Sequence, residues 1–122
     1  MKLKSVIESL SKVTIDREFV AQLEKMYSTE LPEKVKKVVS IDKASVFYDD
    51  FELLRGLSQE EIIEASEDMA VDFISTGLIP LFDIGDNDYI AYDTIDQMWC
   101  KFNIVDEIKF CKAQDLDEYL SK

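Results

Sequence analysis

One stretch of the sequence, Leu78–Asp93 (LIPLFDIGDNDYIAYD), limits the choice of fold more than any other. It opens with an apolar run that stops at Asp83, and residue types that bend a chain follow as far as Asp88. An aromatic and apolar segment then resumes at Tyr89. The pattern predicts a strand, a tight acidic turn and a returning strand, and therefore an antiparallel hairpin.

Two helices are predicted ahead of this hairpin. Apolar residues recur at three-to-four spacing over Asp16–Tyr27, which is typical of an amphipathic helix. A shorter helix follows, with Pro32 in its first turn. The apolar sides of the two helices consist of Ile15, Phe19, Val20, Leu23 and Met26 in the first and Leu31, Val35, Val38 and Val39 in the second. We expect these sides to pack as a pair.

A third helix is predicted after two short strands, at Ala44–Tyr48 and Phe51–Leu54. Ser58 and Glu61 form a capping box that begins this helix, and Gly77 ends it. Its expected buried positions are Ile62, Ile63, Met69, Ala70, Phe73 and Ile74.

Further strands are predicted after the hairpin. Apolar and polar residues alternate from Met98 to Val105, which indicates a half-buried antiparallel strand. Its core side is expected to carry Met98, Cys100, Phe102 and Ile104. Another strand covers Ile108–Cys111, and Asp115-x-x-Glu118 caps a closing helix with Leu116, Tyr119 and Leu120. We therefore predict one α+β domain over residues 1–122, an antiparallel sheet with helices at its N-terminal side and between its strands.

Length and hydropathy are consistent with one core. The chain has 122 residues, of which 47% are apolar. No apolar run approaches the roughly 18 to 20 residues that span a bilayer. Glu8 interrupts the N-terminal segment MKLKSVIESL before a hydrophobic region develops, so we expect no secretory signal, no membrane partner and residence in the cytoplasm.

Acidic residues are concentrated in the second part of the chain. Residues 1–47 hold nine Lys or Arg and seven Asp or Glu, a net charge of +2, whereas residues 48–122 hold five and 19, a net charge of −14. The whole chain therefore carries −12. Such a surface repels nucleic acid and anionic lipid and attracts a basic protein. Acidity that serves only solubility is the simpler alternative. We favoured a binding role because the acids gather in the turn-and-strand region and not along exposed helix faces.

The residue inventory excludes several kinds of catalysis. There is no histidine, so neither a Ser-His-Asp nor a Cys-His pair can form. The glycines at 56, 77 and 85 are too scattered for a phosphate-binding loop. Cys100 and Cys111 fall in predicted strands, where we expect them to be reduced and partly buried, without a zinc site or disulfide. The sequence predicts no catalytic residue, no metal and no cofactor.

Four aspartates of the hairpin invite a calcium interpretation: Asp83, Asp86, Asp88 and Asp93. The loop lacks the sixth-position glycine and twelfth-position glutamate of an EF-hand, which argues against that site. Paired carboxylates also serve glycosidases, but no sugar-stacking groove is evident.

The aromatic residues of the sheet leave alternatives open. Trp99 falls on the opposite strand face from Cys100, so it either packs under a helix or loop or is an exposed interface anchor. Alternation sends one of Tyr89 and Tyr92 inward and the other outward. Asp93 either caps a turn or contacts a partner.

The hairpin also carries a family signature. An Ile-Pro pair opens its first strand, a Gly/Asp/Asn turn follows, and Asp-Tyr-Ile-x-x-Asp forms the second strand. This order resembles the SUKH superfamily, in its branch of cell-wall-assembly-regulator-like domains, which bacteria commonly use as toxin immunity proteins. Leu31-Pro32 ahead of a short helix and Asp115–Leu120 agree with it, whereas Asn87 stands where the family usually has glycine.

The resemblance implies an antiparallel sheet with flanking helices and a protein-binding role. The hypothesis is an immunity protein that neutralises a toxin, plausibly a nuclease, by covering its basic groove with acidic side chains. The alternatives are a regulatory or scaffolding module that binds a host protein, and small-molecule binding between helices and sheet. Candidate partner-binding residues are Asp49, Asp50, Asp83, Asp86, Asp88, Tyr92, Asp93, Asp96 and Trp99.

Overall fold

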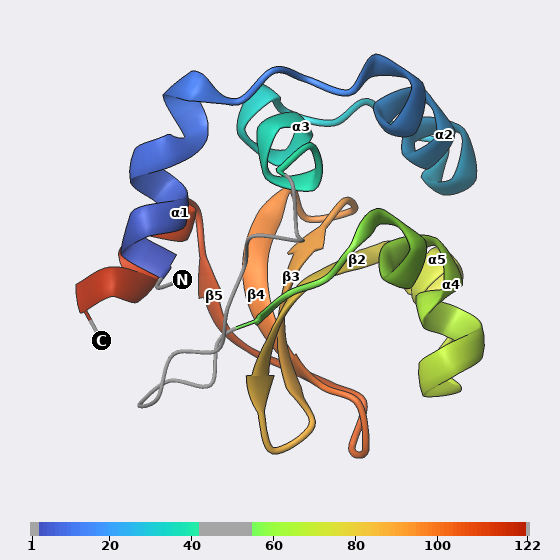
Figure 1. Ribbon diagram of the computed structural model, residues 1–122. Coiled ribbons are helices and arrows are strands. Elements are labelled where there is room, and N and C mark those ends of the chain that lie inside the picture. The colour runs from blue at the N-terminus through green and yellow to red at the C-terminus, as the bar shows by residue number, and fades with distance from the viewer. Residues whose placement is uncertain (1–2, 42–54, 122) are drawn as a thin grey trace.

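The sheet of this protein is an antiparallel meander, in which every strand pairs with its neighbour along the chain (Figure 1). The computed structural model describes residues 3–41 and 55–121. Within these ranges the strands are β1 (Arg55–Gly56), β2 (Leu78–Gly85), β3 (Asp88–Asp93), β4 (Met98–Asn103) and β5 (Ile108–Ala113). The strands expected at Ala44–Tyr48 and Phe51–Leu54 lie outside the described residues.

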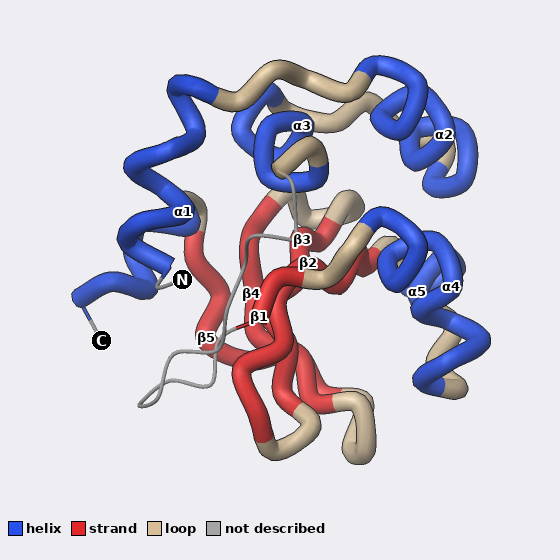
Figure 2. Tube along the Cα trace, in the orientation of Figure 1, coloured by secondary structure: helices blue, strands red, loops and turns tan. Residues whose placement is uncertain are grey.

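The helices are placed at three sides of this sheet (Figures 1 and 2). They are α1 (Leu3–Ser9), the short 3-10 helix η1 (Leu10–Lys12), α2 (Arg17–Tyr27), α3 (Glu33–Val39), α4 (Gln59–Met69), α5 (Phe73–Thr76) and the 3-10 helix η3 (Leu116–Ser121). α1 contacts η3, α2 contacts α3, and both α4 and α5 contact β2. The predicted α+β class is thus confirmed.

The two helices predicted before the sheet are present and pack together. Asp16 caps α2 by accepting a 3.1 Å hydrogen bond from the backbone N–H of Phe19. Pro32 is the residue just before α3, not part of its first turn. The hydroxyl of Tyr27 donates a 2.8 Å hydrogen bond to the carbonyl of Leu78, which ties the end of α2 to the start of β2.

The third predicted helix is broken in two. Ser58 and Glu61 form the expected capping box at the start of α4. The helix then ends at Ala70, whose φ of 54° is left-handed, because Asp72 caps a new helix by accepting from the N–H of Ser75. Ala70 and Ile74 are consequently exposed, which corrects their expected burial.

The hairpin turn is tighter than the sequence suggested. β2 continues as far as Gly85, through two register shifts, so that only Asp86 and Asn87 connect it to β3. Their φ values of 56° and 65° are both positive, as a type I′ turn requires. Asparagine tolerates this conformation, so Asn87 can occupy a position where glycine is the usual choice.

Both faces of the sheet are covered, which corrects the half-buried interpretation of β4. Cys100 and Phe102 belong to a smaller cluster, in which Phe102 meets Phe73 edge-on at 5.8 Å. Trp99 points to the other face, into the larger cluster beneath the helices. That larger cluster includes Leu23, Val38 and Leu116.

The cysteines differ from expectation in one respect. Cys100 is buried, and its burial raises the pKa of its thiol to about 11. Cys111 is exposed, because β5 pairs with β4 alone in the described sheet. The backbone of Cys111 is left-handed (φ 49°), at a register shift between the two strands. This residue was expected to be partly buried.

Candidate protein-binding surface

The acids at the tip of the β2–β3 hairpin hold the hairpin in shape. Asp83 accepts a 3.0 Å hydrogen bond from the N–H of Gly85, and Asp88 accepts one of 2.8 Å from the side-chain amide of Asn103. Asp86 is exposed in the turn itself. Two of the three carboxylates predicted to face a partner here, those of Asp83 and Asp88, therefore form hydrogen bonds within the sheet.

Asp83 also belongs to a charged cluster across β1 and α4. Arg55 lies between Glu61, at 2.8 Å, and Asp83, at 3.9 Å. The hydrogen bond from Arg55 is the main cause that holds the pKa of Glu61 below its usual value. Because Glu61 also accepts from the N–H of Ser58, this cluster fixes the start of α4 against the sheet.

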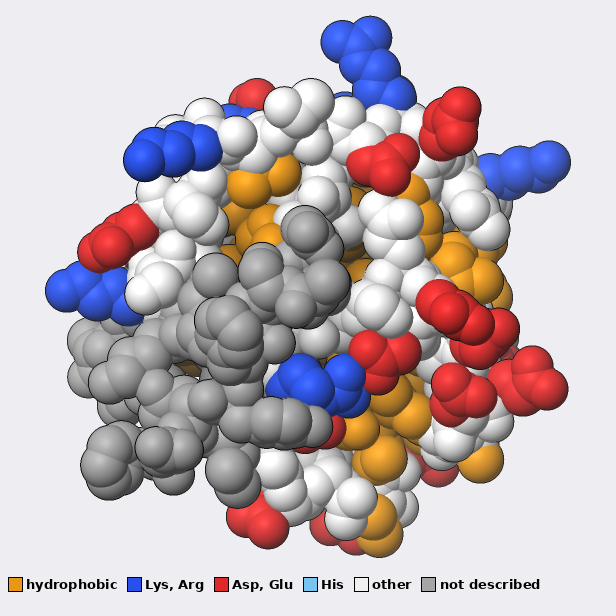
Figure 3. Space-filling view, in the orientation of Figure 1, with side chains coloured by type: hydrophobic (Ala, Val, Ile, Leu, Met, Phe, Trp, Pro, Cys, Tyr) orange, Lys and Arg blue, Asp and Glu red, His pale blue; other side chains and the backbone are white. Residues whose placement is uncertain are grey.

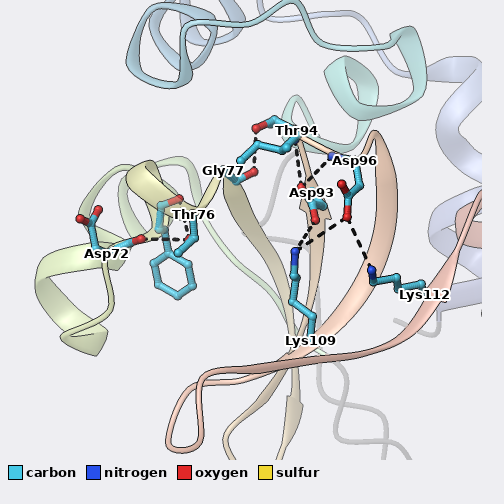
Figure 4. Close-up of polar contacts among 10 residues, drawn as sticks. Asp72, Thr76, Gly77, Asp93, Thr94, Asp96, Lys109 and Lys112 are labelled. Atoms are coloured by element: carbon cyan, nitrogen blue, oxygen red, sulfur yellow. Dashed lines mark hydrogen bonds and ion pairs between the residues drawn. The ribbon is translucent and has the colours of Figure 1, made fainter.

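A second charged cluster lies at the other end of β3 (Figure 4). One oxygen of Asp93 accepts from the N–H groups of Ile95 and Asp96, and the other is 2.9 Å from the ammonium of Lys109. Asp96 pairs with Lys112 at 3.6 Å. Burial raises the pKa of Asp93, but the Lys109 and backbone hydrogen bonds outweigh it and leave the pKa below its ordinary value. This cluster closes the β3–β4 turn.

Three of the candidate partner residues lie inside the folded chain. Tyr92, Asp93 and Trp99 are 4%, 2% and 3% exposed, respectively. Tyr92 and Trp99 meet edge-on at 5.4 Å within the larger cluster, and Tyr89 is the half-buried one of the two tyrosines. None of the three belongs to the outer surface. Tyr92 and Trp99 are covered by the helices packed on their face of the sheet. Asp93 points to the opposite face and is enclosed by the β3–β4 turn and Lys109.

The remaining candidates divide between exposed and undescribed positions. Asp96 is exposed, although its carboxylate is paired with lysines. Asp49 and Asp50 lie outside the described residues. The hairpin therefore does not present the free acidic surface that the sequence predicted.

An acidic row that the sequence analysis missed runs along α4. We call Glu60, Glu64, Glu67 and Asp68 the α4 acidic face; all four are exposed. Figure 3 shows acidic side chains gathered over this part of the molecule. In the part of the chain that the structure describes, no lysine or arginine forms an ion pair with them. This corrects the expectation that the acids avoid helix faces. Their spacing of three and four residues in the sequence already indicates that they share one face of a helix.

The carboxylates of this face repel one another. The nearby charge of Glu60 is the main cause that raises the pKa of Glu64, with Asp68 and Glu67 adding to it. A cation supplied from outside would relieve this repulsion. The α4 acidic face is therefore suited to a basic partner.

A groove borders the α4 acidic face on the side of α2. It has a volume of about 250 Å³ and is lined by Phe19 and Ile63, with polar groups from both helices. Glu60 and Glu64 stand at its edge. The apolar floor beside free carboxylates offers a place for a side chain with an aliphatic stem and a charged end.

The geometry brings no metal-binding group together in the described ranges. No three Asp, Glu or Cys side chains there converge on one point. Asp88 pairs with Gly85 at the turn, whereas Asp93 pairs with Leu78 at the opposite end of the same two strands. The four hairpin aspartates are thus separated, which argues against the calcium interpretation.

Comparison with protein-family models and with curated proteins finds no match for this chain. None of the helices in the described ranges is long and apolar enough to span a bilayer.

Proposed function

We propose that this protein is a non-enzymatic binding domain that neutralises a basic bacterial toxin, in the manner of a SUKH immunity protein. The observation that carries the proposal is the α4 acidic face, a row of exposed carboxylates that have no counter-ion among the described residues and lie beside a groove lined in part by Phe19 and Ile63. A charged row of this kind costs folding energy through self-repulsion, which a cationic partner removes.

The proposed mechanism is steering followed by occlusion. The net charge of −12 attracts a basic surface, and the α4 acidic face then occupies the place of substrate phosphates on a nuclease-type toxin. The SUKH resemblance of Ile79–Asp93 supplies the immunity role, and the charge distribution supplies the sign of the partner. Residence in the cytoplasm, where a toxin of this class would act, is part of the same proposal.

The test is a protection assay. Products of the genes that flank the gene for this protein are expressed in a bacterial host, each with and without the protein. We expect one product to be toxic alone and tolerated when the protein is present. If no flanking product is toxic, or if toxicity is unchanged, immunity is wrong and the regulatory or scaffolding alternative takes its place.

A charge-matched pair of variants locates the contact. The first replaces Glu60, Glu64 and Glu67 with Gln, and the second replaces Glu8, Glu18 and Glu30 with Gln. All six side chains are exposed, and both variants remove three negative charges. Protection should be lost with the first variant and kept with the second. Equal behaviour of the two would show that net charge alone matters and that α4 is not the contact.

A further inference from the structure

A small pocket lies where α3, the β3–β4 turn and the segment after β5 meet. Its volume is about 170 Å³, below the roughly 300 to 1,000 Å³ typical of drug-sized ligands but more than a single water needs. Val35, Tyr92 and Trp99 line it, and Lys34 and Asp115 also border it. Figure 1 shows α3 above this end of the sheet.

Two buried side chains that line this pocket have polar groups without a hydrogen-bond partner in the described residues. Tyr92 and Trp99 are 4% and 3% exposed, yet neither the hydroxyl nor the indole N–H is bonded to any group in residues 3–41 or 55–121. No fully enclosed side-chain polar atom in those ranges lacks a partner. Both groups must therefore keep some contact with open space, and both residues line the pocket. Buried tyrosine and tryptophan usually pair these groups.

The ammonium of Lys34 and the carboxylate of Asp115, which both border the pocket, pair with each other. The ammonium of Lys34 lies 2.7 Å from Asp115 and 3.4 Å from Asp117. An anionic ligand would place a third carboxylate near an ammonium that two already share. A cationic ligand would meet Lys34 and leave the indole N–H, which can only donate, without an acceptor. These contacts favour a neutral group.

We propose that this pocket binds a primary carboxamide, either a free small amide or the side chain of an Asn or Gln from a bound protein. Its carbonyl oxygen accepts from the indole N–H of Trp99 and the hydroxyl of Tyr92. Its NH₂ group donates to side-chain oxygens of Gln97 and Gln114, which also line the pocket. The site is separate from the α4 acidic face and does not depend on the proposed immunity role.

Trp99 is the only tryptophan, so it gives a single indole signal in an ¹⁵N–¹H spectrum. Acetamide should shift this signal saturably, and acetate or methylammonium should not. Tyr92→Phe removes one neutral hydrogen bond and should weaken acetamide binding about five-fold. The control is Tyr89→Phe on the same strand, a half-buried tyrosine outside the pocket lining, which should leave binding unchanged.

Two capped peptides distinguish the sources of the amide. Acetyl-Gly-Gln-Gly-N-methylamide is compared with acetyl-Gly-Ala-Gly-N-methylamide, which has no primary carboxamide, and with acetamide. Stronger binding of the glutamine peptide than of both others indicates a protein side chain, and binding of acetamide alone indicates a small molecule. Absence of a saturable indole shift with every amide, or equal binding of acetate, would overturn the proposal and leave a pocket that holds only water. Because the wild-type titration decides this, the test survives if Tyr92→Phe fails to fold.

Discussion

The ammonium of Lys109 lies 2.9 Å from the carboxylate of Asp93, whose side chain is only 2% exposed. The pair joins the end of β3 to β5 across β4, while the second oxygen of Asp93 closes the β3–β4 turn. A buried carboxylate with three hydrogen bonds is stable only while all three remain in place.

Removal of the Asp93 carboxylate should therefore be costly. Asp93→Ala loses all three hydrogen bonds, and we expect the free energy of unfolding to fall by about 2 to 3 kcal/mol. Asp93→Asn keeps an oxygen for the N–H groups of Ile95 and Asp96, so the loss should be about 1 kcal/mol. Urea denaturation measures both. The exposed neighbour serves as control, since Asp96→Asn should change stability by less than about 0.5 kcal/mol. Equal losses for all three variants would contradict this account.

Stability should also fall in acid. The pKa values of Asp93, Glu61 and Asp115 lie below their ordinary values in the folded protein, the last because of its hydrogen bond from Lys34. Groups with lowered folded pKa values contribute stability that is complete above the unfolded value, 3.8 for Asp93, and is lost as the pH falls through the folded value. We expect the free energy of unfolding to decline from about pH 5 to about pH 2. Asp93→Asn should show a shallower decline, and an unchanged slope would exclude Asp93 as a contributor.

Gly77 should not tolerate a side chain. Its φ is 77°, and an added Cβ would lie 2.8 Å from both the Ile95 side chain and the Thr94 hydroxyl. That hydroxyl is held by its own 2.7 Å hydrogen bond to the Gly77 carbonyl. Gly77→Ala should reduce the free energy of unfolding by about 1 to 3 kcal/mol.

The double variant Gly77→Ala with Ile95→Ala separates the steric contact with Ile95 from the other causes of this loss. Ile95 is 69% exposed, so its truncation alone costs little. Partial recovery in the double variant is expected, because truncation removes the contact with Ile95 but leaves both the contact with Thr94 and the backbone strain. Full recovery would mean that the backbone conformation is not strained by alanine.

Association with the basic partner should depend strongly on salt. The Debye length shortens from about 10 Å at 0.1 M to about 3 Å at 1 M, so steering weakens over that range. We expect the association rate constant to fall on the order of ten-fold or more, as stopped-flow mixing would show. The variant that replaces Glu60, Glu64 and Glu67 should show a weaker dependence than the one that replaces Glu8, Glu18 and Glu30. An association rate that ignores salt would contradict electrostatic steering.

The local elements of secondary structure could be predicted from the order of the residues. The periodicity of Asp16–Tyr27, the capping box at Ser58 and the Leu78–Asp93 hairpin were all predicted, because each depends on neighbours within a few residues. The absence of histidine likewise limited the chemistry from the start. The helix α1 was not predicted, although Leu3, Val6 and Leu10 are spaced for one buried side.

Which side chains are exposed and unpaired depends on how the elements pack, and the sequence did not predict it. Alternation along a strand separates two faces but cannot say whether a helix covers each of them. The exposure of Trp99 and Tyr92 was therefore left open, and both were counted among the candidate partner residues although they are buried. Counting acids cannot reveal that Lys109 neutralises Asp93 across the sheet, whereas the α4 acidic face has no basic partner among the described residues. Charge and burial at a site depend on contacts between residues far apart in sequence, and these contacts exist only in the folded chain.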